Sequence, residues 1–282
     1  MQDKNFVQRA VKPLLVTAVV AGVALLVAAR AEPTAIKAAA HPAPAVAQRC
    51  DAPLDMVRFA HPLARVTRKL AAGEPVTIVA IGSSSTAGAG ATSPAASYPS
   101  RLAVELQERF PKQSIVVINR GVNGEEVGDM LKRFDAAVID AKPDLVLWQL
   151  GTNSVIRDHT SYDHVGGIRE GLRKIRAAGA DVVLIDPQFA PKVIAKMDGA
   201  TKMVTLISTT AKRENVDLFR RFEVMKRWVE VDHMPIETIV APDGLHLNDW
   251  SYACMAKGLS VAISEAVKRP VVSATAAPHL VP

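Results

Sequence analysis

The chain is poor in aromatic residues and in cysteine, and each shortage excludes a kind of protein. Aromatic side chains make up 5% of the 282 residues, and no cluster of lysine and arginine is interleaved with them, so no nucleic acid partner is expected. The two cysteines, Cys50 and Cys254, form no Cys-x-x-Cys pair and no Cys/His cluster. The sequence therefore predicts no metal site, and its chemistry must rest on other side chains.

The amino-terminal residues have the order of an export signal. Three basic residues within residues 1–12 precede an uncharged apolar run over 14–29, and Ala29-Arg30-Ala31 follows. We expect residues 1–31 to be a signal peptide, which predicts a periplasmic or secreted protein. The alternative is a membrane anchor over 14–29, although roughly 20 apolar residues are needed to span a bilayer comfortably. Half of the formal net charge of +6 belongs to these first 31 residues.

Two segments beside the central part of the chain lack any apolar period. Residues 32–49 are rich in alanine and proline and predict a linker, and residues 270–282 predict a flexible tail. The intervening residues 50–269 are enough for one domain with a sizeable core. We favour one disulfide between Cys50 and Cys254, which export permits, with two separate thiols as the alternative because spacing alone does not show that they meet.

The domain alternates short β-branched apolar runs with amphipathic segments. This alternation predicts a parallel sheet covered by helices on both faces, an α/β fold in three α/β/α layers. Functional loops in such folds lie beyond the carboxyl ends of the strands. We expect strands buried on both faces at 76–81, 115–119, 144–150 and 181–186, a weaker fifth strand at 216–219, and helices at 98–110, 125–141, 162–178, 199–214 and 250–268.

Polar or glycine-rich loops follow three of these strands. They are Gly82-Ser83-Ser84, Arg120-Gly121-Val122-Asn123-Gly124 and Gly151-Thr152-Asn153. The carboxyl ends of parallel strands share one edge of the sheet, so the three loops should converge. Asp243-Gly244-Leu245-His246 comes about 160 positions after the serines. A serine, a histidine and an acid are the groups needed for nucleophilic catalysis through an acyl-enzyme.

Simpler interpretations of each motif remain open when the motif is taken alone. The serine loop is also typical of a helix-capping turn, and Asp243-Gly244 of an ordinary turn beside a structural histidine. The serine loop lacks the Gly-Lys-Ser/Thr ending of a phosphate-binding loop and the second glycine of Gly-x-Ser-x-Gly. Ser83 and Ser85 are rival nucleophiles to Ser84.

Together, the motifs resemble the four blocks of the SGNH hydrolase superfamily, also called GDSL esterases and lipases, over roughly residues 75–268. The resemblance implies a flavodoxin-like fold with a mainly parallel five-stranded sheet. It implies a catalytic triad of Ser84, Asp243 and His246, and an oxyanion hole formed by the backbone N–H groups of Ser84 and Gly124 and the amide of Asn153. These groups supply the whole mechanism, so no metal or organic cofactor is expected.

Two positions depart from the superfamily pattern. Ser83 stands where Gly-Asp-Ser has its aspartate, and Ser154 stands where an aspartate often follows the block-three asparagine. Neither position belongs to the triad, so the departures concern positioning rather than chemistry. Just past this loop, His159, with Arg157 and Tyr162, is a candidate for contact with the substrate.

The expected function is that of an exported serine esterase, acting as a monomer. Few aromatic residues and no long apolar lid favour a short acyl group, so the predicted substrate is an acetyl ester on a carbohydrate, such as an acetylated polysaccharide of the cell envelope or outside the cell. Membrane contact is expected only if the leader is uncleaved. The alternatives are an O-acyltransferase, a lysophospholipase or thioesterase-like lipid hydrolase, and a non-catalytic glycan-binding protein of the envelope.

Overall fold

The computed structural model describes residue 50, residues 53–159 and residues 163–270. These belong to the second of two units of the chain, residues 48–282. The predicted signal peptide or anchor (1–31) and linker (32–49), and the tail beyond residue 270, lie outside the described residues. Among the helices that the structure describes, none is long and apolar enough to span a membrane.

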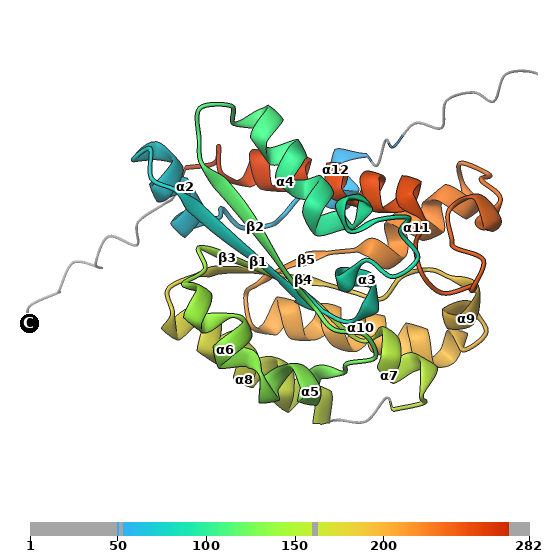
Figure 1. Ribbon diagram of the computed structural model, residues 1–282. Coiled ribbons are helices and arrows are strands. Elements are labelled where there is room, and N and C mark those ends of the chain that lie inside the picture. The colour runs from blue at the N-terminus through green and yellow to red at the C-terminus, as the bar shows by residue number, and fades with distance from the viewer. Residues whose placement is uncertain (1–49, 51–52, 160–162, 271–282) are drawn as a thin grey trace, which may run out of the picture. The chain divides into compact units, whose positions relative to one another are not determined.

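A five-stranded parallel sheet forms the centre of the fold (Figure 1). The strand order β2-β1-β3-β4-β5 places β1 and β3, which precede two of the predicted site loops, in the middle of the sheet. The predicted α/β fold is confirmed, and each strand lies within two residues of its predicted bounds. The strands are β1 (Val76–Gly82), β2 (Ile115–Gly121), β3 (Leu145–Gln149), β4 (Asp181–Ile185) and β5 (Asp217–Phe219).

One prediction about the sheet is wrong, because β2 is not buried on both faces. It pairs only with β1 and forms an edge of the sheet, where Val116 is 53% exposed. Its run of β-branched residues reflects strand propensity rather than burial. In contrast, β3 is buried along its whole length, and its Trp148 packs edge-on against Phe134 with ring centroids 5.1 Å apart.

Helices cover both faces of the sheet (Figure 1). Helices α4 (Tyr98–Arg109) and α12 (Asp249–Ala266) pack together on one face, and α8 (Asp163–Ala177) and α10 (Met197–Arg213) lie on the other. The remaining helical elements are α1 (Leu54–Val57), α2 (Ala64–Ala71), α3 (Ser84–Ala87), η1 (Pro94–Ala96), α5 (Val127–Lys132), α6 (Phe134–Ala137), η2 (Ile139–Ala141), α7 (Thr152–Ile156), α9 (Pro191–Ile194), α11 (Arg221–Glu230) and η3 (Ile236–Thr238).

Two helix predictions need correction. The helix expected over 125–141 is divided into α5, α6 and η2, because the chain leaves helical geometry at Arg133, whose guanidinium turns back to the Arg120 carbonyl at 2.8 Å. Helix α11 is absent from the prediction, although Phe222, Met225 and Trp228 recur at helical spacing and are buried.

The predicted disulfide is confirmed. Cys50 and Cys254 are joined; their Cα atoms lie 4.9 Å apart, and the two residues are separated by 204 positions in sequence. The bond attaches the start of the domain to the amino-terminal third of α12, the last helix that the structure describes.

Candidate active site

The serine loop lies at the carboxyl end of β1 and leads directly into α3, which begins at Ser84. Two glycines allow this short helix to pack closely. A Cβ atom on Gly82 would stand 2.2 Å from the Thr86 hydroxyl oxygen, and one on Gly121 would stand 2.1 Å from the Ala87 nitrogen. Gly82 and Gly121 are also paired in the register of β1 and β2. The two loops that follow these strands therefore begin side by side, as predicted.

The structure brings Ser84, His246 and Asp243 into one hydrogen-bonded chain. The Nε2 atom of His246 lies 2.8 Å from the Ser84 Oγ atom, and its Nδ1 atom hydrogen-bonds the Asp243 carboxylate. When Nδ1 donates to that carboxylate, Nε2 is left to accept the Ser84 hydroxyl proton. These are the contacts that the roles predicted for the three residues require.

The Asp243 carboxylate is held by the turn that it begins. Its Oδ1 atom accepts from the backbone N–H groups of Leu245 and His246, at 2.9 and 3.0 Å. Burial raises the pKa of Asp243, but the hydrogen bonds from His246 and Leu245 outweigh this effect and lower it to about 2. The acid is therefore ionised at neutral pH and able to stabilise a protonated His246.

The three adjacent serines point in different directions. Ser83 donates its hydroxyl and its backbone N–H to Oε1 of Gln149, at 3.0 and 2.9 Å, and Ser85 accepts from the Arg221 guanidinium at 2.9 Å. Both side chains are buried in these contacts. The Ser84 hydroxyl is the one that hydrogen-bonds His246, so the geometry favours Ser84 over Ser83 and Ser85 as the nucleophile.

The predicted oxyanion residues Gly124 and Asn153 lie on neighbouring loops. Gly124 has a φ of 79°, a left-handed conformation that glycine adopts at little cost. The Asn153 side chain donates one N–H to the Glu125 backbone oxygen at 2.9 Å. An amide nitrogen carries two hydrogens, so a second N–H remains to meet a substrate oxygen. The Ser84 N–H is the first of α3, and the first N–H of a helix has no intrahelical acceptor.

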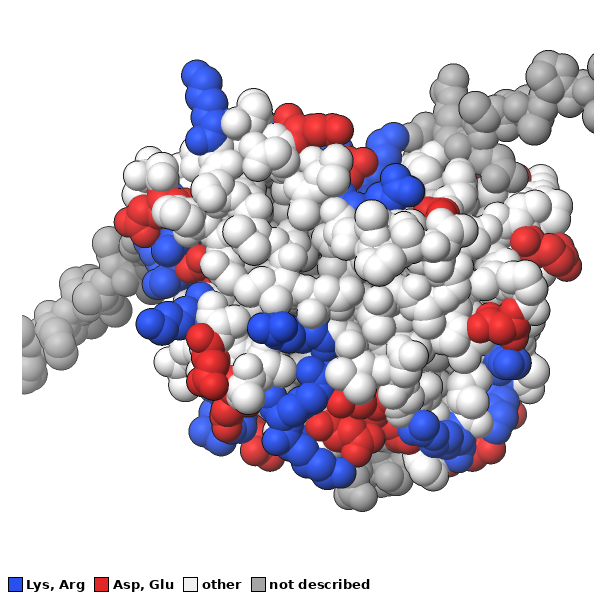
Figure 2. Space-filling model, in the orientation of Figure 1, with Lys and Arg blue, Asp and Glu red and all other residues white. Residues whose placement is uncertain are grey.

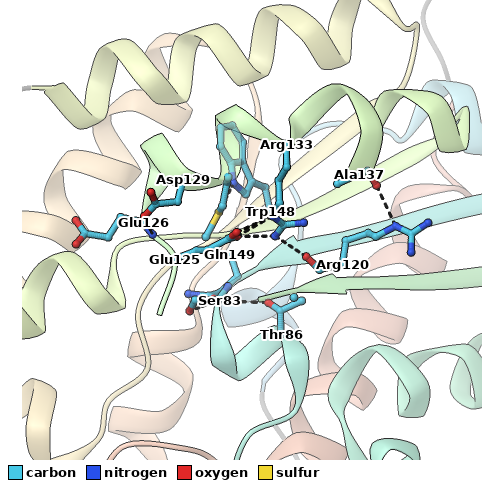
Figure 3. A network of polar contacts seen from close by, with 12 residues as sticks. Ser83, Thr86, Arg120, Glu125, Glu126, Asp129, Arg133, Ala137, Trp148 and Gln149 are labelled. Atoms are coloured by element: carbon cyan, nitrogen blue, oxygen red, sulfur yellow. Dashed lines mark hydrogen bonds and ion pairs between the residues drawn. The ribbon is translucent and has the colours of Figure 1, made fainter. Parts of the chain in front are cut away.

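A pair of adjacent glutamates fixes these loops. The Glu125 carboxylate accepts from Arg133 at 2.6 to 2.9 Å, and Figure 3 shows Arg133 also reaching the Arg120 carbonyl. The Glu126 carboxylate accepts from Ser154 at 2.9 Å and Arg157 at 2.7 Å. Burial raises the pKa of Glu126, but the hydrogen bonds from Arg157, Ser154 and His159 lower it overall, so the carboxylate stays ionised.

The candidate substrate contacts past Asn153 belong to the same cluster. The Nδ1 atom of His159 lies 3.1 Å from the Glu126 carboxylate. The Arg157 guanidinium donates to the Gly124 carbonyl at 2.9 Å. Both side chains are exposed beside the oxyanion loops, at 61% and 44%. Tyr162 lies outside the described residues.

Several residues that position the site have no sequence motif. Gln149, at the end of β3, accepts from both Ser83 and Thr86 and so joins the serine loop to the strand before Asn153 (Figure 3). Gln188 accepts from the Thr152 hydroxyl at 2.8 Å and donates to the Leu245 carbonyl at 3.3 Å. Each glutamine joins two loops far apart in sequence, which no local spacing rule identifies.

A cavity of about 550 Å³ adjoins the Asp243–His246 turn. Its volume falls within the range of roughly 300 to 1,000 Å³ that is typical of small-molecule sites. Its walls are mainly apolar, and they include Gly90, Pro191, Ile236, Val240 and Gly244. In the part of the chain that the structure describes, no group of three histidine, cysteine or acidic side chains is placed to hold a metal ion.

Curated relatives match short parts of the chain. An arylesterase from Vibrio mimicus is 30% identical over 95 residues, which are 34% of this chain and 46% of the relative. An acetylxylan esterase from Geobacillus stearothermophilus is 39% identical over 54 residues, 19% of this chain and 25% of the relative. The chain thus spans less than half the length of each relative.

Similar solved structures support the fold. A two-domain esterase active on acetylated mannans has a TM-score of 0.64 at 17% identity, over 80% of this chain and 60% of that one. A catalytic mutant of an acetylxylan esterase from Geobacillus stearothermophilus has a TM-score of 0.57 at 18% identity, over 67% of this chain and 94% of that one. The predicted relationship to SGNH hydrolases is confirmed. The model of the non-GDSL lipase-like family matches residues 49–269, and the chain therefore belongs to that family.

Proposed function

We propose that the protein is a serine esterase that hydrolyses carboxylic esters through an acyl-enzyme on Ser84. The observation that carries the proposal is the hydrogen-bonded chain from Ser84 through His246 to Asp243. The Ser84 Oγ atom attacks the ester carbonyl while His246 takes its proton. The imidazolium then returns that proton to the departing alcohol, which leaves an acyl-serine. Water, deprotonated by His246, releases the acid and restores the serine.

Negative charge gathers on the carbonyl oxygen in both steps. The backbone N–H groups of Ser84 and Gly124 and the second amide N–H of Asn153 would receive it. The hydrogen bond from Asn153 to the Glu125 oxygen fixes the amide before substrate arrives, so little reorganisation is needed. Asn153 therefore offers a direct test of the oxyanion hole.

Replacing Asn153 with alanine should lower kcat by about 100- to 1,000-fold and change KM little, because the lost donor acts mainly on the developing charge. Asn153→Asp keeps the shape but removes the N–H donors, and should lose as much. Initial rates with p-nitrophenyl acetate measure both. Gln107→Ala is the matched control, because it removes an amide that also donates to a backbone oxygen, but at an exposed position of α4. A folded Asn153→Ala variant with the parent kcat would exclude the amide from the site.

The substrate that we propose is an acetyl ester on a carbohydrate outside the cytoplasm. Two similar proteins are named for acetylated xylan or mannan as substrate. The disulfide supports export, since disulfides persist in oxidising compartments. In Figure 2 the region over α3 and α11 is mostly uncharged, which suits a neutral sugar ester.

A lipid hydrolase is the second candidate, and the cavity beside the triad turn favours it. The walls formed by Pro191, Ile236 and Val240 are apolar, and about 550 Å³ would accommodate a longer acyl chain. The two candidates differ in the acyl group that they prefer. They also differ in the effect on ester hydrolysis that we expect from a substitution that fills the cavity.

A series of p-nitrophenyl esters from acetate to octanoate, together with acetylated xylo- and manno-oligosaccharides, separates the candidates. We expect acetate to give the highest kcat/KM and the oligosaccharides to release acetic acid. Ile236→Trp, which fills the cavity, should then leave acetate hydrolysis unchanged, and Val116→Trp on the edge strand is its size-matched control. Preference for octanoate, abolished by Ile236→Trp alone, would instead support the lipid hydrolase. Acetyl transfer to an added sugar acceptor would indicate an acyltransferase.

A further inference from the structure

Arg221 places a buried guanidinium directly behind the serine loop. It is the first residue of α11 and is only 1% exposed. Its Nη1 atom donates to the Ser85 hydroxyl at 2.9 Å, and its Nε atom donates to the Asp186 backbone oxygen at 2.9 Å. One side chain thus connects α3, the end of β4 and the start of α11. Ser85, the residue that it holds, is next to Ser84.

The charge of Arg221 is incompletely balanced. Asp186 is the acid that acts on the guanidinium electrostatically, but one of its carboxylate oxygens accepts from the Phe222 N–H at 2.9 Å. The other, Oδ2, and the Nη2 atom of Arg221 are both buried without a hydrogen-bond partner among the described residues. The hydroxyl-bearing rings of Tyr98, from α4, and Tyr252, from α12, are the other titratable groups that face the guanidinium.

Burial shifts the pKa values of Arg221 and Asp186 in opposite directions. It lowers the pKa of Arg221, yet a guanidinium keeps its proton at neutral pH. It raises the pKa of Asp186, which favours the neutral acid. The Nη2 atom of Arg221 and the Oδ2 atom of Asp186, both buried and unpartnered among the described residues, leave the guanidinium incompletely compensated beside α3. Burying such a charge is costly, and an apolar side chain of similar size would avoid that cost.

We propose that Arg221 is a positioning residue for the nucleophile, and this inference rests on the proposed function. Through Ser85 it holds α3 so that the Ser84 hydroxyl faces His246. Its positive charge also stabilises the negative charge that develops at the amino end of α3 during acyl transfer. A fixed charge in a water-excluded interior acts strongly and needs no reorganisation during the reaction.

The proposal predicts an effect on the transition state rather than on binding, because Arg221 is buried and does not contact substrate. Arg221→Met should lower kcat by about 10- to 100-fold and leave KM within about threefold. Labelling of Ser84 by a phosphonate, which builds similar charge, should slow in parallel. Arg221→Lys keeps a charge and should be faster than Arg221→Met. Ser85→Ala breaks the hydrogen bond while keeping the guanidinium, and should lower kcat several-fold.

The experiment measures kcat and KM for p-nitrophenyl acetate, the labelling rate and the melting temperature of the full-length chain and each variant. Arg227→Met is the matched control on the same helix, where the arginine pairs with Asp232 at 3.4 Å; its kcat should equal the parent value. A folded Arg221→Met variant with the parent kcat would overturn the proposal, and equal rates for the lysine and methionine variants would overturn its electrostatic part. If Arg221→Met does not fold, Ser85→Ala decides, and an unchanged kcat there counts against the proposal.

The failure of this inference can be distinguished from failure of the esterase proposal. A parent protein that neither turns over esters nor takes up phosphonate at Ser84 would contradict the esterase proposal itself. A parent protein that does both, with Arg221 variants that are equally fast, would contradict the role of Arg221 alone.

Discussion

Replacing Ser84 with alanine should abolish phosphonate labelling and lower kcat by roughly a millionfold, as loss of a triad nucleophile does in other serine hydrolases. The reason is geometric, since Ser84 is the serine whose hydroxyl lies 2.8 Å from His246 Nε2. Intact-protein mass after phosphonate treatment gives the labelling result. Hydrolysis of p-nitrophenyl acetate gives the rate.

Ser83→Ala is the matched control for this prediction, because its hydroxyl is bound to Gln149 rather than to the histidine. It should retain a single adduct. An adduct that persists in Ser84→Ala and disappears in Ser83→Ala would identify Ser83, and not Ser84, as the nucleophile. Esterase activity that survives both changes would require a different mechanism.

Reducing the Cys50–Cys254 disulfide should lower the free energy of unfolding more than any of the substitutions above. In the chain-entropy model, a bond that closes a loop of this length contributes about 5 kcal/mol, and measured values are commonly about 2 to 4 kcal/mol. Urea unfolding of the oxidised and reduced protein measures the difference. The loss arises because the reduced unfolded chain gains freedom that the crosslink denies it.

The double variant Cys50→Ser/Cys254→Ser separates this effect from general effects of the reductant. Its unfolding midpoint should match that of the reduced parent and should not respond to reductant. If the oxidised parent and the double variant unfold at the same urea concentration, the crosslink contributes nothing to stability. Such a result would mean that the two segments are held together by packing alone.

The order of the motifs was enough to predict where the loops that carry the candidate residues converge. Ser84 and Asn153 each follow a strand, and the carboxyl ends of parallel strands share an edge, so topology alone brings their loops together. The Asp243–His246 contact is local, because three positions in a turn suffice. These features depend on element order and short spacing, which a sequence displays directly.

The residues that hold the loops could not be predicted in this way. Glu126 binds Ser154 and Arg157, Gln149 binds Ser83, and Arg221 binds Ser85 across 136 positions. A charged or amide side chain can pair with many partners, so its residue type does not identify the partner that it binds in the fold. The same limit explains why the sequence does not predict the break at Arg133.

The two departures from the superfamily pattern have structural explanations in these contacts. Ser83 stands in place of an aspartate and is bound by Gln149, and Ser154 stands in place of another and is bound by Glu126. In each case a longer polar side chain from a different element meets the shorter serine. The loops are therefore fixed without the missing carboxylates.

The proposed acid and base, Asp243 and His246, come from a single turn, whereas the proposed nucleophile and oxyanion donors come from loops after β1, β2 and β3. The segment between α11 and η3 separates these two groups in the chain. Cutting the backbone there would leave Ser84, Gly124 and Asn153 on one fragment and Asp243 and His246 on the other, together with α12. The Cys50–Cys254 disulfide would still join the two fragments, so activity that persists after this bond is reduced would report noncovalent complementation through the packing of α12 against α4.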